Sequence, residues 1–204
     1  SDVTDVRMGH VLQAGVGQAP ARQAAIHAGL PPETRTVTVH KVCGSGMQAV
    51  IDGAYALGAG AASIVVAGGM ENMSAAPHLL PNARSGYRLG HQQVVDSLIR
   101  DGLWDPYNDL HMGACAERCA ERYALTRAQQ EAYAIESFRR ANAAQQDGRF
   151  AGEIVPVDVP AGKRTTRVEH DEGPSRVDYD KIPVLRPAFE VPSPFLVDHP
   201  SSVS

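Results

Sequence analysis

The stretch TVTVHKVCGSGMQAV, residues 36–50, predicts the local structure around which the first part of the chain is organised. Residues 36–42 are β-branched at five of seven positions, which is typical of a strand. From Gly46 onward apolar residues recur at helical spacing until glycines at 58 and 60 end the pattern, at Met47, Val50, Ala54 and Leu57. Cys43 therefore lies where a strand gives way to a helix.

The flanking sequence continues this alternation of strand and helix. Residues 20–28 start with a proline suited to the first turn of a helix and are followed by Gly29, a typical helix stop. Residues 63–67, SIVVA, predict a second buried strand that ends at Gly68. A strand–helix–strand unit implies parallel strands, a right-handed crossover and helices that cover the sheet. The sequence thus predicts an α/β fold.

The pattern changes after Met73, where loop signals replace the alternation and mainly helical segments follow. The predicted helical segments lie near residues 96–101, after Gly113 and from Thr126. The last of them opens with a capping box formed by Thr126 and Gln129, and Gly148 closes it. Residues 153–159, EIVPVDV, predict a short strand. We therefore expect a domain boundary near Met73.

Composition excludes several classes of function. The net charge of −4 and the aromatic content of 5% do not favour nucleic-acid binding, because a slightly acidic chain repels phosphates. The three cysteines show no disulfide framework, which favours reduced thiols and a cytoplasmic location. Residues 53–70 are uncharged, but glycines interrupt them and their period changes midway, so we expect no membrane span. The first residues also lack the pattern of a secretory signal.

Cys43 is the strongest candidate for a catalytic residue. A thiol at the carboxyl end of a strand, beside the first N–H groups of a helix, is in a position that favours the thiolate. Gly44 and Gly46 would permit a sharp turn and let a substrate carbonyl approach backbone N–H groups. The alternative is a buried cysteine that packs as a small apolar residue.

A second functional interpretation uses the same segment. Gly44-x-Gly46-x-x-Ala49 after a strand matches the loose dinucleotide-binding fingerprint, and Glu71 lies where a ribose-binding acid would follow. An oxidoreductase that binds a dinucleotide therefore stays an alternative. Against it, such a turn usually opens a domain, and the fingerprint gives no role to Cys43.

Six motifs in order carry a resemblance to a known family: VHKVCGSGMQAV, AGGMENMSAAPHLL, DGLWDPYNDLHMGACAE, LTRAQQEAYAIESFRRA, DGRFAGEIVPV and LRPAF. Together they resemble the thiolase family over nearly all of residues 6–189, and the His-Met-Gly at 111–113 favours its acetyl-CoA acetyltransferase branch. The resemblance implies a partial thiolase-like α/β fold. Residues 1–73 would belong to the N-terminal core half and residues 74–189 to an inserted, mainly helical loop domain, followed by a divergent tail at 190–204.

The resemblance also implies a reaction. Cys43 would be acylated by an acyl-CoA, and two acetyl-CoA would give acetoacetyl-CoA and free CoA in a reversible condensation. Family positions that line the CoA site match Leu103, His111, Met112 and Arg186. Coenzyme A thioesters would be the substrates, with no further cofactor and no metal. The family favours a homo-oligomer, a tetramer or a dimer.

The sequence departs from the family in ways that bear on activity. The G-H-P motif that supplies the activating histidine and the C-x-G-G-G motif that supplies a second catalytic cysteine are absent from the 204 residues. We therefore expect these residues alone to be inactive or nearly so. A non-catalytic CoA-binding module stays a further alternative. A metal site formed by the helical row His111, Cys115 and Cys119 is another, which we do not favour because structural zinc ligands normally come as pairs from separate segments.

Overall fold

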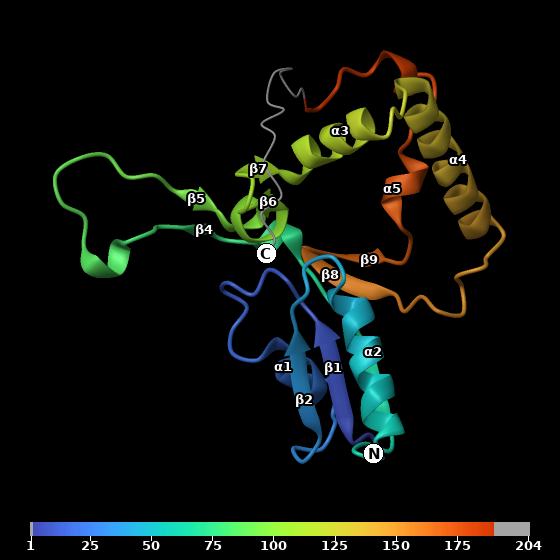
Figure 1. The fold of residues 1–204 in the computed structure, drawn as a ribbon. Helices are drawn as coiled ribbons and strands as arrows, with labels where there is room; N and C mark the ends of the chain where they lie inside the picture. The colour runs from blue at the N-terminus through green and yellow to red at the C-terminus, as the bar shows by residue number, and fades with distance from the viewer. Residues whose placement is uncertain (1, 190–204) are drawn as a thin grey trace, which may run out of the picture. The chain divides into compact units, whose positions relative to one another are not determined.

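The computed structural model describes residues 2–189, and the chain divides into two compact units, Ser1–Met112 and Gly113–Ser204. The first unit is built on a three-stranded parallel sheet with the order β2-β1-β3 (Figure 1). Its strands are β1 (Asp5–Gly9), β2 (Arg35–Val39) and β3 (Val65–Gly69). The α/β class and the parallel strands predicted from the sequence are confirmed.

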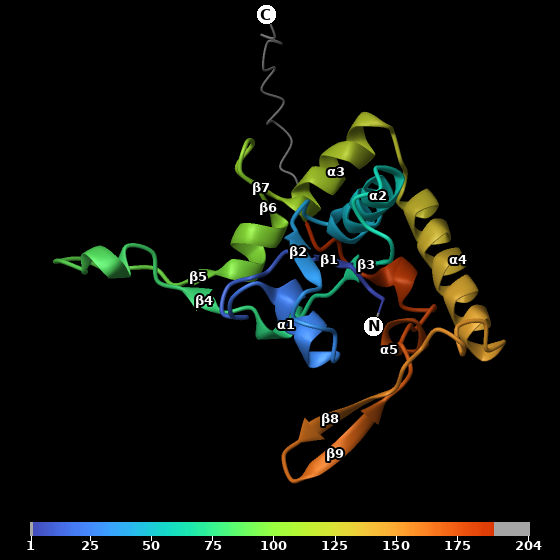
Figure 2. The ribbon, with the colours of Figure 1, turned by 90° about the horizontal axis from the view of Figure 1, so that it is seen from below.

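Two helices cover the sheet, one on each face. Helix α1 (Pro20–His27) joins β1 to β2, and helix α2 (Ser45–Gly58) joins β2 to β3 across the central strand. The step from β1 to β2 runs toward one edge of the sheet, and the step from β2 to β3 runs toward the other edge. Because both crossovers are expected to be right-handed, the two helices must lie on opposite faces. The view along the sheet in Figure 2 shows this arrangement.

The central strand β1 is the element that the sequence analysis missed. Its sequence, DVRMG, alternates charged and apolar residues over only four positions and contains no run of β-branched residues. Asp5 of this strand is buried and is paired with Arg7 at 3.3 Å and with Arg35 of the neighbouring strand. Because β1 lies between them, β2 and β3 are not adjacent, as a simple strand–helix–strand unit would suggest they are.

The predicted element bounds needed small corrections. The strand expected at residues 36–42 ends at Val39, because the chain turns before Cys43, and the strand expected at 63–67 begins at Val65. Residues 53–70, which are uncharged, form the end of α2, a connecting turn and β3. None of the helices within residues 2–189 combines the length and apolarity needed to cross a membrane.

Small residues allow the helices to lie close to the sheet. In α1 the buried Ala21 and Ala25 are four residues apart, and in α2 the buried Ala49, Gly53 and Ala56 occupy one face. A Cβ atom on Gly53 would lie 3.1 Å from Val65 Cγ1, so α2 could not approach β3 as closely with a larger residue. This tight packing fixes the start of α2 against the sheet.

The rest of the first unit consists of short elements. Strands β4 (His78–Leu79) and β5 (Val95–Asp96) pair antiparallel, as do β6 (Trp104–Asp105) and β7 (Leu110–His111). Between them lies a π-helix, Leu98–Leu103, where the sequence predicted helix near residues 96–101. The fully buried Ser97 anchors its start, because its hydroxyl donates to the Pro77 carbonyl at 2.5 Å.

The second unit is mainly helical, with one hairpin. Helix α3 (Met112–Arg122) spans the division between the units, and α4 (Arg127–Gln146) begins with the predicted capping box between Thr126 and Gln129. Strands β8 (Val157–Ala161) and β9 (Arg164–Val168) form an antiparallel hairpin, and α5 (Glu172–Ser175) follows. The strand expected at 153–159 therefore begins four residues later.

The two compact units divide between residues 112 and 113. The segment after Met73 belongs to the first compact unit, because its π-helix packs on the loop that follows β1: a Cβ on Gly102 would lie 3.4 Å from Leu12. The division into a core half and an inserted domain stays a prediction, and the predicted tail at 190–204 lies outside the described residues.

Candidate active site

Cys43 lies in the turn between β2 and α2, at the carboxyl edge of the parallel sheet, and it is exposed. Two backbone hydrogen bonds close this turn: Gly44 N donates to the Lys41 carbonyl and Ser45 N to the Val42 carbonyl, each at 3.1 Å. The sulfur therefore sits directly before the first turn of α2, where the positive end of the helix dipole favours an anion. The alternative of a buried, packing cysteine is wrong.

The strained residue of this turn is Val42 and not one of the two glycines. Val42 has a φ of 48°, a left-handed conformation that is rare for a β-branched residue, whereas Gly44 has an ordinary φ of −85°. Gly44 therefore does not supply the left-handed residue of this turn. The side chain of Ser45 holds the turn instead, because its buried hydroxyl donates to the Val42 carbonyl at 2.5 Å and accepts from Lys41 N at 2.8 Å.

Three glycines let the ends of β1 and β3 approach the first turn of α2. Gly9 ends β1, Gly46 lies in the first turn of α2 and Gly69 ends β3. A Cβ on Gly9 would lie 2.7 Å from the Ser45 carbonyl oxygen and closer still to Gly46 N, so no side chain fits there. A Cβ on Gly69 would be 3.4 Å from Gly46 Cα. The glycines that end β1 and β3, more than those of the turn, allow the start of α2 to lie close to the sheet.

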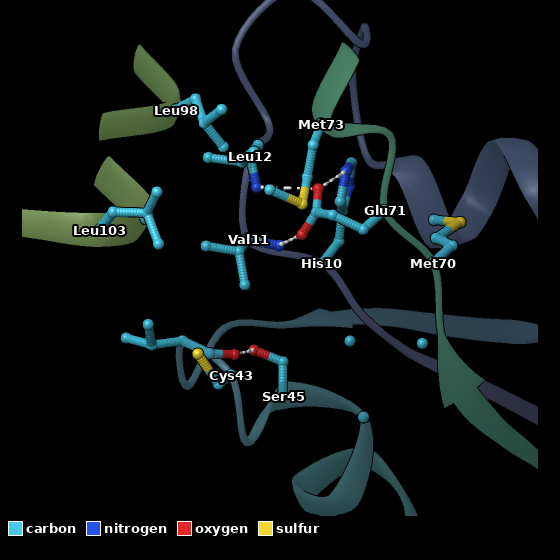
Figure 3. Close-up of a pocket in the computed structure, with 15 residues that line it drawn as sticks. His10, Val11, Leu12, Cys43, Ser45, Met70, Glu71, Met73, Leu98 and Leu103 are labelled. Carbon is cyan, nitrogen blue, oxygen red and sulfur yellow. Dashed lines mark hydrogen bonds and ion pairs between the residues drawn. The ribbon is translucent and has the colours of Figure 1, made fainter. Parts of the chain in front are cut away.

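A cavity of about 420 Å³ opens beside Cys43 (Figure 3). Its walls come from the ends of β1 and β3, the turn before α2 and the π-helix. In a π-helix, residues four and five positions apart share a face. Leu98, Gly102 and Leu103 therefore all line the cavity. The other lining residues are Gly9, His10, Val11, Leu12, Val42, Ser45, Gly46, Gly69, Met70, Glu71 and Met73. Most of this surface is apolar.

Glu71 and His10 form the polar part of the cavity wall. The Glu71 carboxylate accepts from Val11 N at 2.9 Å and Leu12 N at 3.2 Å, and it pairs with His10 Nε2 at 3.1 Å. Figure 3 shows this group across the cavity from Cys43. A carboxylate engaged by three donors of its own chain is not positioned to bind a ribose. Together with the interposed strand β1, this argues against the dinucleotide-binding interpretation.

Of the predicted CoA-site residues in the first compact unit, one lies with Cys43 in the structure. Leu103 lines the same cavity. His111 lies in β7, paired with Trp104 of β6, and Met112 begins α3; neither lines the cavity. Arg186 is exposed in the second compact unit. The roles assigned to these four residues stay predictions.

The sequence did not predict the part of the cavity wall formed by the loop after β1, because it did not predict the strand itself. A single histidine at position 10 carries no signal of its own, and Glu71 was considered only as a ribose ligand. The helical row His111, Cys115 and Cys119 does not form a metal site: within residues 2–189, no three His, Cys, Asp or Glu side chains are grouped as metal ligands.

Comparison with known proteins identifies the family of the chain. A family model described as the thiolase N-terminal domain matches residues 1–193. The chain belongs to the thiolase family. This thiolase chain is 51% identical over 190 residues to acetyl-CoA acetyltransferase 2 of Arabidopsis thaliana, a match that covers 92% of the chain and 47% of the relative. It is 50% identical over 187 residues to the mitochondrial acetyl-CoA acetyltransferase erg10A of Aspergillus fumigatus, covering 92% and 43%.

Solved structures give the same result for the fold. The crystal structure of the Acat5 thiolase of Ascaris suum in complex with coenzyme A superposes with a TM-score of 0.86 at 42% identity. The match covers 95% of this chain and 48% of that one. The expected thiolase-like fold is thereby confirmed, and the chain spans about half the length of the thiolases it matches. Because one relative is named mitochondrial, the cytoplasmic location stays a prediction.

Proposed function

We propose that this thiolase chain carries the nucleophile of an acyltransferase that forms or cleaves acetoacetyl-CoA, with Cys43 as the acyl acceptor. The observation that carries the proposal is the exposed Cys43 thiol beside an apolar cavity, directly before the first turn of α2. The relatives named acetyl-CoA acetyltransferases and the thiolase solved with coenzyme A support acyl-CoA as the substrate class.

The proposed acyl transfer proceeds in two steps at one carbon atom. The Cys43 thiolate attacks the thioester carbonyl of an acyl-CoA, which forms a new S–C bond and places negative charge on the carbonyl oxygen. Backbone N–H groups at the start of α2 favour that charge. The bond between the carbonyl carbon and the CoA sulfur then breaks, and the CoA thiolate takes up the proton released by the Cys43 thiol. The acyl group remains on Cys43.

Completion of a carbon–carbon bond requires groups beyond Cys43. The acceptor acetyl-CoA must lose a proton from its α-carbon, which calls for a general base. The G-H-P and C-x-G-G-G motifs that supply such groups in the family are absent from these 204 residues. We therefore propose that the chain accepts an acyl group but performs no condensation alone, and that Leu103, His111, Met112 and Arg186 contact CoA. A homo-oligomer is proposed on the family resemblance.

Intact-mass spectrometry after incubation with acetyl-CoA tests the acyl-enzyme. We expect the wild-type chain to gain the mass of one acetyl group and Cys43→Ala to gain none. Cys119→Ala is the matched control, because Cys119 is also exposed but lies in α3, and it should be acetylated as the wild type is. Acetylation that persists in Cys43→Ala, or its absence from the wild type, would refute the proposal and favour a CoA-binding module without catalysis.

A further inference from the structure

The carboxylate of Glu71 holds together two chain segments that are sixty residues apart in sequence. It follows β3 by two residues, and it binds the loop that follows β1 through Val11 N, Leu12 N and His10 Nε2. A backbone bond from Met70 N to the Gly9 carbonyl at 2.9 Å joins the same segments one residue earlier. The side chains of Val11 and Leu12 both line the cavity beside Cys43.

The contact uses both oxygens of the Glu71 carboxylate. One carboxylate oxygen receives Val11 N, and the other receives both Leu12 N and the imidazole of His10. Hydrogen bonds to an ionised acceptor are stronger than those between neutral groups. His10 is only 6% exposed, and within residues 2–189 its Nδ1 has no hydrogen-bond partner, so Glu71 supplies the side-chain contact that fixes the ring.

We propose that Glu71 is a positioning residue which fixes the Val11–Leu12 wall of the cavity and thereby sets the length of acyl chain that Cys43 accepts. The inference rests on the proposed function of Cys43 and adds a determinant of specificity to it. Glu71 does not touch the acyl group; it acts through the two backbone amides. If the contact is lost, the wall relaxes and the cavity admits longer chains.

The variant Glu71→Gln is the direct test, because it keeps the size of the side chain and removes its charge. Glutamine offers one acceptor oxygen and an NH₂ group, so at least one of the three donors would face another donor. We expect the amides of Val11 and Leu12 to exchange with deuterium about 30-fold faster than in the wild type. We also expect the ratio of the Cys43 acylation rates with acetyl-CoA and hexanoyl-CoA to fall about tenfold.

Asp5→Asn is the matched control. Asp5 is also an ion-paired carboxylate of the first unit, but it is more deeply buried than Glu71 and lies at the opposite end of β1 from the cavity. This variant should lower stability while leaving the acylation ratio and the two amide exchange rates unchanged. Equal changes in both variants would show that Glu71 acts only through general stability and would overturn the proposal.

Two further measurements keep the inference separate from the proposed function. Val11→Ala shortens the wall while its backbone N–H can still bind Glu71, so it should lower the same ratio without faster amide exchange; an unchanged ratio would overturn the proposal. If the wild type accepts no acyl group, the proposed function of Cys43 fails. The exchange rates in Glu71→Gln then still decide whether Glu71 fixes the wall.

Discussion

A methyl group added at Gly9 would have to displace backbone atoms. The Cβ of an alanine there would lie 2.7 Å from the Ser45 carbonyl oxygen and closer to Ser45 C and Gly46 N. These atoms belong to the first turn of α2, which the packing of α2 on β3 holds in place, so a flexible side chain cannot relieve the overlap. Overpacking in a core costs typically about 1–3 kcal/mol. Because the overlap is with backbone, we expect Gly9→Ala to lower the free energy of unfolding by about 3 kcal/mol.

The assay is urea denaturation followed by fluorescence. Trp104 is the single tryptophan of the chain and lies in the same compact unit as the sheet. Gly68→Ala serves as the control, because a Cβ at Gly68 of β3 would meet only Met8 side-chain atoms at 3.8 Å or more. That variant should change the free energy of unfolding by less than about 1 kcal/mol. A Gly9→Ala protein as stable as the Gly68→Ala protein would refute the close approach of β1 and α2.

Three further predictions concern the turn before α2 and the second unit. Ser45→Ala leaves the Lys41 N–H and the Val42 carbonyl without their side-chain partner, and should lower the free energy of unfolding by about 1–3 kcal/mol in the same urea assay. Val42→Gly relieves the left-handed strain and should raise the free energy of unfolding by up to about 1 kcal/mol. The same change at Val50, an exposed residue of α2, should lower it by a similar amount, about 1 kcal/mol. Destabilisation at both positions would contradict the strain at Val42. Thr126→Ala removes the cap of α4 and should destabilise that helix by about 1 kcal/mol, seen as faster amide exchange in its first turn and not elsewhere in the helix.

Local patterns in the sequence determined much of the fold, because the forces involved act between near neighbours. The capping box of Thr126 depends on residues three positions apart, and the alternation of β2, α2 and β3 depends on side-chain spacing within each element. The same local pattern placed Cys43 between a strand and a helix. The motifs that resemble thiolases added the family, which the comparisons confirm.

Only the tertiary structure decided what surrounds Cys43. Strand β1 has little local propensity; it pairs with a neighbouring strand on each side, and its buried Asp5 is ion-paired with the exposed Arg35. Its position in the middle of the sheet brings His10, Val11 and Leu12 to the cavity and joins them to Glu71, sixty residues away in sequence. Contacts of this kind depend on close packing between distant segments, such as the approach of Gly9 to Gly46, and no spacing along the chain encodes them.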